Sequence, residues 1–76
     1  MRLVHSGARQ LLIAIRDPQG QLVELQRDNG KGWVTIHSYR AVLAVRLNDL
    51  ATNANYRVVV ADSAGYRAAV TKTVWL

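Results

Sequence analysis

The strongest structural signal in the sequence is a tyrosine that begins an apolar strand in the last third of the chain. From Tyr56 onward apolar residues occupy alternate positions, and Gly65 closes a turn nine residues later. The preceding segment, residues 48–55, is polar and contains one large apolar side chain, Leu50. Such a polar segment is typical of a corner between sheets, so the pattern predicts a strand that enters a hydrophobic core directly after a corner.

Most of the remaining chain consists of strand-length apolar runs separated by turn residues. Residues 17–20 are typical of a β-turn with Pro18 at its second position, and Asn29 and Gly30 supply the positive φ angles that a hairpin requires. No stretch has the period of a long amphipathic helix. We therefore expect one all-β domain over residues 1–76, with strands in the ranges 9–16, 21–27, 33–39, 41–47, 56–62 and 66–76.

The alternation within these runs also predicts which side chains are buried. Val23 and Leu25 share one face of their run, and Val34 and Ile36 share one face of the next. One face of each strand must cover the core. The expected core residues are Ile13, Ile15, Val23, Leu25, Leu43, Val45, Leu47, Leu50, Val58 and Val60.

Three of these segments resemble parts of the immunoglobulin-like and fibronectin type III-like β-sandwiches. In that family a tyrosine stands near the start of strand F, two residues before the second disulfide cysteine. Tyr56 has this place, and Val58 occupies the cysteine position. Residues 43–50 look like strand E, and residues 24–36 look like strand C, its hairpin and strand C′. The resemblance implies a small antiparallel sandwich of about six to seven short strands.

The chain departs from the family pattern at two points. Both disulfide cysteines are missing, and strand C has no tryptophan, so Val23 or Leu25 fills that part of the core. The resemblance implies a cysteine-free sandwich of the kind common in bacterial and bacteriophage proteins, and a small open barrel is the alternative. In the sandwich, the Tyr56 hydroxyl is expected to bond to the backbone of residues 48–55 while its ring packs on Leu50.

The absence of cysteine limits how so small a domain is stabilised. Neither a disulfide framework nor a cysteine-based zinc site can form, which favours a reducing compartment or assembly with other chains. The first residues lack the apolar region of a signal peptide, and residues 11–15 are an apolar run far shorter than the ~20 residues that span a bilayer. We expect a protein that stays in the cell that makes it; a secreted fragment with a new initiator methionine is the alternative.

No residue pattern in the chain is typical of an enzyme. Four of the five acidic residues stand in or beside turns, where Asp caps backbone N–H groups. His5 and His37 have no partner at a metal-ligand spacing, and no serine lies in a GxSxG elbow. The glycines around Lys31 lack the spacing of a phosphate loop. We expect no catalytic activity, no metal and no cofactor.

The chain is basic, with a net charge of +5, and eight of its ten cations are arginine. The arginines are spread about one per strand, whereas a nucleic-acid-binding protein gathers its cations into a patch. Protein interfaces favour arginine over lysine. We therefore prefer a solubilising surface with some interface arginines to a nucleic-acid-binding surface.

Several positions that should face outward are apolar, which is unusual for a free monomer. These positions are Val42, Ala44, Val59 and Ala61, alongside Arg46 and Arg57. The chain also ends in three apolar residues. The expected interface residues are Arg46, Arg57, Val59, Trp75 and Leu76. For Trp33 with Tyr39, we favour packing at the end of the core over a surface that stacks a ligand.

Together these observations favour a structural assembly module. Proteins that resemble this chain occur on bacteriophage capsids and tails, where they decorate or cement the lattice or adhere weakly to surface sugars. We therefore expect a homo-oligomeric virion component, made in the host cytoplasm, whose partners are copies of itself and a capsid or tail, with no membrane contact. The alternatives are a bacterial cell-surface adhesin-type domain that binds carbohydrate or protein, and a basic nucleic-acid-binding module.

Overall fold

The computed structural model describes residues 2–61 and 68–76, and within these residues it contains eight strands and no helix. The strands are β1 (Arg2–Gly7), β2 (Gln10–Ala14), β3 (Leu22–Asp28), β4 (Trp33–Arg40), β5 (Ala44–Leu47), β6 (Asn55–Val60), β7 (Ala69–Val70) and β8 (Val74–Trp75). The all-β prediction is confirmed, although the described part of the chain has eight short strands where six to seven were expected. The turn expected at residues 62–65 lies outside the described residues.

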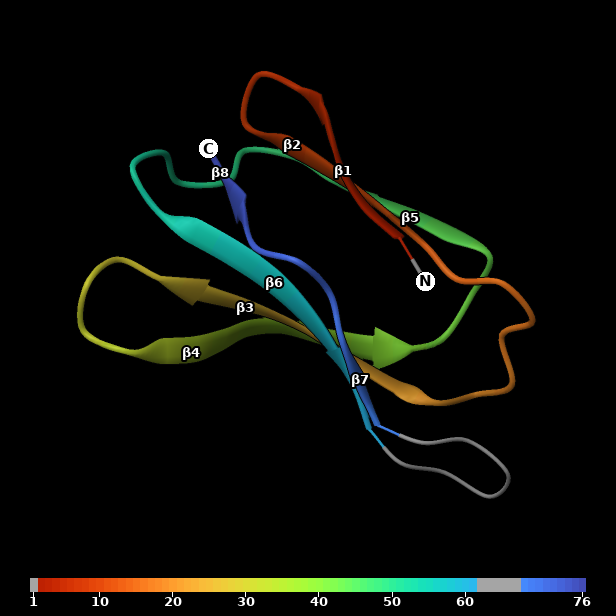
Figure 1. Cartoon of the computed structure of the whole chain (residues 1–76). Coiled ribbons are helices and arrows are strands. Elements are labelled where there is room, and N and C mark those ends of the chain that lie inside the picture. The colour runs from red at the N-terminus through yellow and green to blue at the C-terminus, as the bar shows by residue number, and fades with distance from the viewer. Residues whose placement is uncertain (1, 62–67) are drawn as a thin grey trace.

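The strands form two antiparallel sheets (Figure 1). One has the order β1-β2-β5; the other has the order β4-β3-β6-β7, with β8 also paired to β6. Buried side chains from β2 of the first sheet and from β3 and β6 of the second form one hydrophobic cluster. The two sheets therefore pack face to face as a small β-sandwich.

The predicted hairpin is present between β3 and β4. The Asp28 Oδ1 atom accepts hydrogen bonds from the N–H groups of Gly30 at 2.7 Å and Gly32 at 3.2 Å. Both glycines have left-handed φ angles, of 107° and 103°, which explains why glycine stands at these positions. Residues 17–20 instead connect β2 to β3, which belong to different sheets, and Asp17 has a φ of 54° there.

The start of the chain forms a hairpin where a single strand over residues 9–16 was expected. β1 pairs with β2 through a tight turn in which Arg9 has a φ of 59°. β1 lies at the edge of its sheet, and Leu3 is its one side chain that packs against the core. An edge strand with so little buried surface carries almost no periodic signal, so the sequence does not predict it.

Residues 68–76 form two short strands, β7 and β8, which both pair with β6 and are separated by a bulge. The continuous strand expected over residues 66–76 is interrupted at this bulge, and its first two residues lie outside the described part of the chain. Val70 pairs with Val59, and Val74 pairs with Tyr56, so the segment from β7 to β8 has one more residue than β6 between these pairs. At the bulge, the Thr71 N–H donates to the Val58 carbonyl, and the Val58 N–H donates to the Thr71 Oγ1 atom at 2.9 Å. The threonine hydroxyl thus replaces the backbone partner that the bulge removes.

Most of the predicted core is buried. The buried hydrophobic residues are Leu11, Ile13, Ile15, Val23, Leu25, Ala41, Ala54, Tyr56, Val58 and Val60. Leu47 and Leu50 are half-buried and pack against this cluster, and Val45 is half-buried. The prediction for Leu43 is wrong, because its side chain is 70% exposed. Leu43 lies in a bend before β5 begins, so strand alternation does not apply to it.

A second bulge, in β4, changes which side chains of that strand face the core. Leu25 pairs with His37 and Gln26 pairs with Thr35, so Ile36 has no partner of its own. Ile36 packs against the core, whereas Val34, which lies beside the hairpin loop, is 59% exposed. Because the extra residue reverses the alternation, the two ends of β4 present their odd-numbered residues to opposite faces.

Candidate binding surface on the larger sheet

The outer face of the larger sheet can be assigned from β6. Tyr56, Val58 and Val60 are buried against the other sheet, so Asn55 and Arg57 face away from it, as does Val59. Residues paired across two strands share a face. On β3, the residues paired with these three outward residues of β6 are Asp28, Gln26 and Glu24, which therefore lie on the same outer face.

A row of four paired residues crosses this face and has a tryptophan at each end. Trp33 on β4 pairs with Asp28 on β3, Asp28 pairs with Asn55 on β6, and Asn55 pairs with Trp75 on β8. Three inter-strand steps separate the two tryptophans, which places their Cα atoms about 15 Å apart. We call Trp33, Asp28, Asn55 and Trp75 the tryptophan row. The Trp75 side chain is 58% exposed.

A chain of hydrogen bonds runs beside the tryptophan row. The Arg57 Nε atom donates to Gln26 Oε1 at 2.8 Å, and Gln26 Nε2 donates to Thr35 Oγ1 at 3.4 Å. The Thr35 hydroxyl in turn donates to Glu24 Oε2 at 3.0 Å. These polar side chains hold one another in place across β4, β3 and β6.

Arg57 is fixed by a second contact, with Trp33. Its guanidinium carbon lies 4.1 Å from the centroid of the Trp33 ring, a cation–π contact worth about 0.5–1 kcal/mol at a partly exposed site. Stacking and the Nε bond together restrict the guanidinium group, while its Nη1 and Nη2 atoms make no hydrogen bond to the described residues. A planar guanidinium with free Nη groups is suited to bidentate binding of a carboxylate or phosphate.

The structure brings three of the expected interface residues onto this face and separates two from it. Arg57, Val59 and Trp75 lie on the outer face of the larger sheet. Arg46 lies on β5 in the smaller sheet, where it pairs with Leu12. Leu76 is half-buried against the core, and its backbone N–H and carbonyl bond to residues 53–54, so this side chain is partly covered by the domain's own fold.

The two aromatic residues of β4 do not form a common surface. Tyr39 pairs with Val23 and packs against the core, as expected. Trp33 does not pack against the core but stacks under Arg57 on the outer face, which corrects the expectation for this residue. The bulge at Ile36 separates them onto opposite faces. A usable signal in the sequence is the position of Trp33 two residues before Thr35, on the polar side of the alternation.

The outer face of the smaller sheet has a different character. Its paired residues form one row of Arg2, Ala14 and Ala44 and a second row of Val4, Leu12 and Arg46. The two arginines stand at opposite corners, and the positions between them are aliphatic. We call these six residues the aliphatic face.

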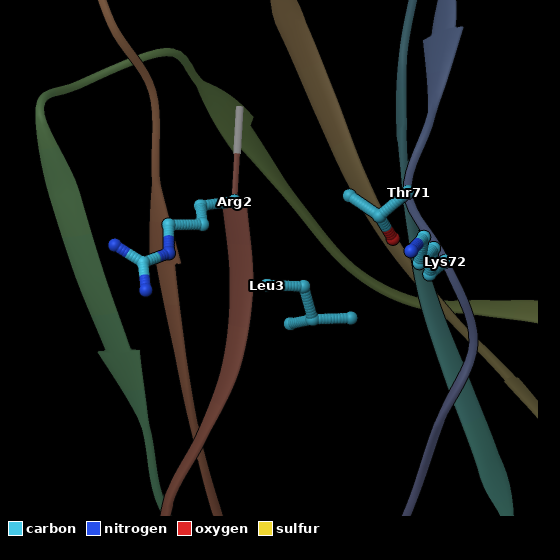
Figure 2. A pocket seen from close by; sticks show the side chains of 4 residues that line it. All are labelled: Arg2, Leu3, Thr71 and Lys72. Atoms are coloured by element: carbon cyan, nitrogen blue, oxygen red, sulfur yellow. The ribbon is translucent and has the colours of Figure 1, made fainter.

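A pocket of about 250 Å³ lies between β1 and the segment that follows β7. Its lining residues are Arg2, Leu3, Thr71 and Lys72. Figure 2 shows the Leu3 side chain pointing from β1 toward Thr71 and Lys72, whereas Arg2 extends to the other side of its strand. The pocket therefore does not gather its two cations around one anion-binding point.

Within residues 2–61 and 68–76, no three His, Cys, Asp or Glu side chains come together as possible metal ligands. The same residues include no helix long and apolar enough to cross a membrane. The outer face of the larger sheet presents indole, amide and guanidinium groups, those of Trp75, Asn55 and Arg57. In comparisons with known proteins, no protein-family model, no curated protein and no solved structure matches the chain.

Proposed function

We propose that the chain is a cysteine-free member of the immunoglobulin-like sandwiches. The strand orders β1-β2-β5 and β4-β3-β6-β7 correspond to the orders A-B-E and C′-C-F-G of such domains. In this correspondence β6 is strand F, and Tyr56 stands near its start with its hydroxyl bonded to the backbone five residues upstream. Strand order and corner bond are independent features, and both support the proposal.

We also propose that the protein is a non-enzymatic structural module that acts through protein–protein contacts, as a decoration, cement or tail component of a bacteriophage virion. The observation that carries this proposal is the aliphatic face. An outward sheet face in a free monomer normally carries Thr, Lys and Glu, whereas this one has Val4, Leu12 and two alanines between its two arginines. Aliphatic centres with arginines at the rim are typical of protein interfaces.

The charges on the aliphatic face indicate what kind of partner would cover it. Two copies packed face to face would bring Arg2 and Arg46 of each copy together and repel one another. An acidic or neutral surface of a larger particle matches this face better. Copies of the chain can instead associate through the free edges of β1 and β5, each of which pairs only with β2 among the described strands.

The proposal is tested by light scattering at micromolar concentration and by co-sedimentation with capsid and tail preparations. Ala44→Glu changes an exposed position of the aliphatic face, and Val34→Glu changes an exposed position of the larger sheet. We expect the unchanged protein to form oligomers and to co-sediment, Ala44→Glu to lose co-sedimentation, and Val34→Glu to keep it. A monodisperse monomer that binds neither preparation would overturn the proposal, and capsid or tail genes beside its own gene would support it.

A further inference from the structure

We propose that the outer face of the larger sheet is a binding site for a carboxylate-bearing oligosaccharide, with Arg57 as the carboxylate ligand and Trp75 as the ring on which a sugar stacks. This site lies on the opposite side of the sandwich from the aliphatic face. The inference therefore goes beyond the proposed assembly function and does not depend on it.

The first argument is the state of Arg57. Its Nε atom donates a hydrogen bond to Gln26, and its guanidinium carbon lies over the Trp33 ring, so the group is held before any ligand arrives. A group that is already restricted loses little conformational entropy on binding. The free Nη1 and Nη2 atoms form the fork that binds a carboxylate through two parallel hydrogen bonds.

The second argument is the neighbourhood of Arg57. Asn55 lies two residues earlier on the same strand, about 7 Å away at the Cα atoms, and its amide makes no hydrogen bond to the described residues. Asn55 pairs with Trp75, a residue that is 58% exposed. A free amide beside an open indole can bond to hydroxyl groups while the C–H face of the same sugar ring covers the aromatic ring.

The third argument is the shape and charge of the surface. The site is an open sheet face in which the Cα atoms of the two tryptophans lie about 15 Å apart, a distance that a short oligosaccharide can span. Gln26 and Thr35 lie along this face and favour a hydroxyl-rich ligand over an apolar protein surface. The two carboxylates of the face already accept hydrogen bonds, Glu24 from the Thr35 hydroxyl and Asp28 from two N–H groups of the hairpin loop. The net charge of +5 attracts an acidic ligand and raises its rate of encounter.

Tryptophan fluorescence gives a direct measurement, because Trp33 and Trp75 are the two tryptophans of the chain and both lie on this face. The probes are a hyaluronan tetrasaccharide and 3′-sialyllactose, which carry carboxylates, chitotetraose, which is neutral, and a polyglutamate peptide. We expect a saturable change in emission with at least one acidic sugar. Chitotetraose and polyglutamate should each bind at least about tenfold more weakly, because each lacks one of the two groups that the site recognises.

The variants separate the roles of the residues. Arg57→Lys keeps the charge but loses the fork, and Trp75→Ala removes the stacking ring, so each should weaken binding of the acidic sugar by about tenfold or more. Arg46→Lys, on the smaller sheet, is the matched control and should leave the affinity unchanged. Circular dichroism of each variant checks that it is folded.

Three results would overturn the inference. The first is the lack of any saturable change with both acidic sugars. The second is equal affinity for chitotetraose or polyglutamate, and the third is a folded Arg57→Lys variant with unchanged affinity. None of these results bears on co-sedimentation through the aliphatic face, so this inference and the proposed assembly function can fail separately.

Discussion

The hydroxyl of Tyr56 donates a hydrogen bond of 2.6 Å to the carbonyl oxygen of Ala51, five residues earlier in the chain. The Tyr56 ring is fully buried in the core, whereas Ala51 lies in the exposed segment that carries the chain from β5 of one sheet to β6 of the other. A single side chain therefore fixes both the core and the corner between the two sheets.

We expect Tyr56→Phe to lower the free energy of unfolding by about 1 kcal/mol, the net value of a typical hydrogen bond. The ring stays in the core, and the Ala51 carbonyl can bond to water because its residue is exposed, so the loss should not be larger. Urea denaturation followed by circular dichroism measures the difference. An unchanged unfolding midpoint would show that the corner does not depend on this bond.

The same corner is held from its other side by the hairpin between β1 and β2. The Arg9 Nε atom donates to the Leu50 carbonyl at 2.9 Å, and the Leu50 N–H donates to the Arg9 carbonyl at 3.1 Å. Arg9→Ala should destabilise the domain by less than about 1 kcal/mol, since the contact is exposed and water can replace the side chain. Arg9→Lys should not restore the contact fully, because lysine lacks the Nε geometry. Thermal unfolding of the two variants tests this, and equal stability of all three proteins would contradict it.

The fold could be predicted where local pattern and burial agree. Alternation places Val23, Leu25 and Val58 correctly, and the polar segment before Tyr56 marks the corner. Leu43 could not be placed, because its exposure depends on where the chain bends before β5. β1 could not be predicted either, since an edge strand is defined by the neighbour it pairs with rather than by its own sequence period.

The candidate site was partly visible in the sequence. Alternation along β6 places Arg57 and Val59 on one outer face, and both were expected there as interface residues. The alignment of Trp33 with Trp75 depends on the pairing registers across four strands, including a bulge on each outer side of the sheet. Such registers follow from tertiary packing, so no local pattern reveals them.

Thr71 offers a test of the bulge between β7 and β8. Thr71→Val should cost about 1–3 kcal/mol, because it keeps the shape of the side chain but leaves the N–H of the fully buried Val58 without its acceptor. Thr71→Ser keeps the hydroxyl and should cost much less. Equilibrium unfolding in urea distinguishes them, and similar losses in both variants would mean that the methyl group, not the hydroxyl, supports the bulge.

Tyr39 is the counterpart of Tyr56, because its hydroxyl is buried and makes no hydrogen bond to the described residues. Tyr39→Phe should leave the free energy of unfolding unchanged or raise it by up to about 1 kcal/mol, since an unpaired buried hydroxyl is unfavourable. The same unfolding experiment as for Tyr56→Phe applies. A loss equal to that of Tyr56→Phe would reveal a partner for this hydroxyl.

Tyr39 also predicts a dependence of stability on alkaline pH. Burial raises the pKa of the Tyr39 hydroxyl above its ordinary value. Above the ordinary pKa the unfolded chain ionises and binds fewer protons than the folded chain, so the free energy of unfolding falls as the pH rises from the ordinary pKa toward the folded pKa. Above a pH of about 10, the free energy of unfolding of Tyr39→Phe should therefore fall less steeply with pH than that of the unchanged protein. Parallel loss of stability in both proteins over this range would contradict the prediction.

The exposure of Leu43 leads to a comparison with a core residue. Leu43→Thr should change the free energy of unfolding by no more than about 0.5 kcal/mol, because the side chain is 70% exposed and only its backbone carbonyl, which accepts from the Ile15 N–H, takes part in the fold. Ile13→Val, at a fully buried position of β2, should cost about 0.5–1.5 kcal/mol although it removes only one methylene group. Denaturant unfolding of both variants gives the order of the two effects. A larger loss of stability for Leu43→Thr than for Ile13→Val would contradict the exposure of Leu43 and indicate that its side chain packs in the core.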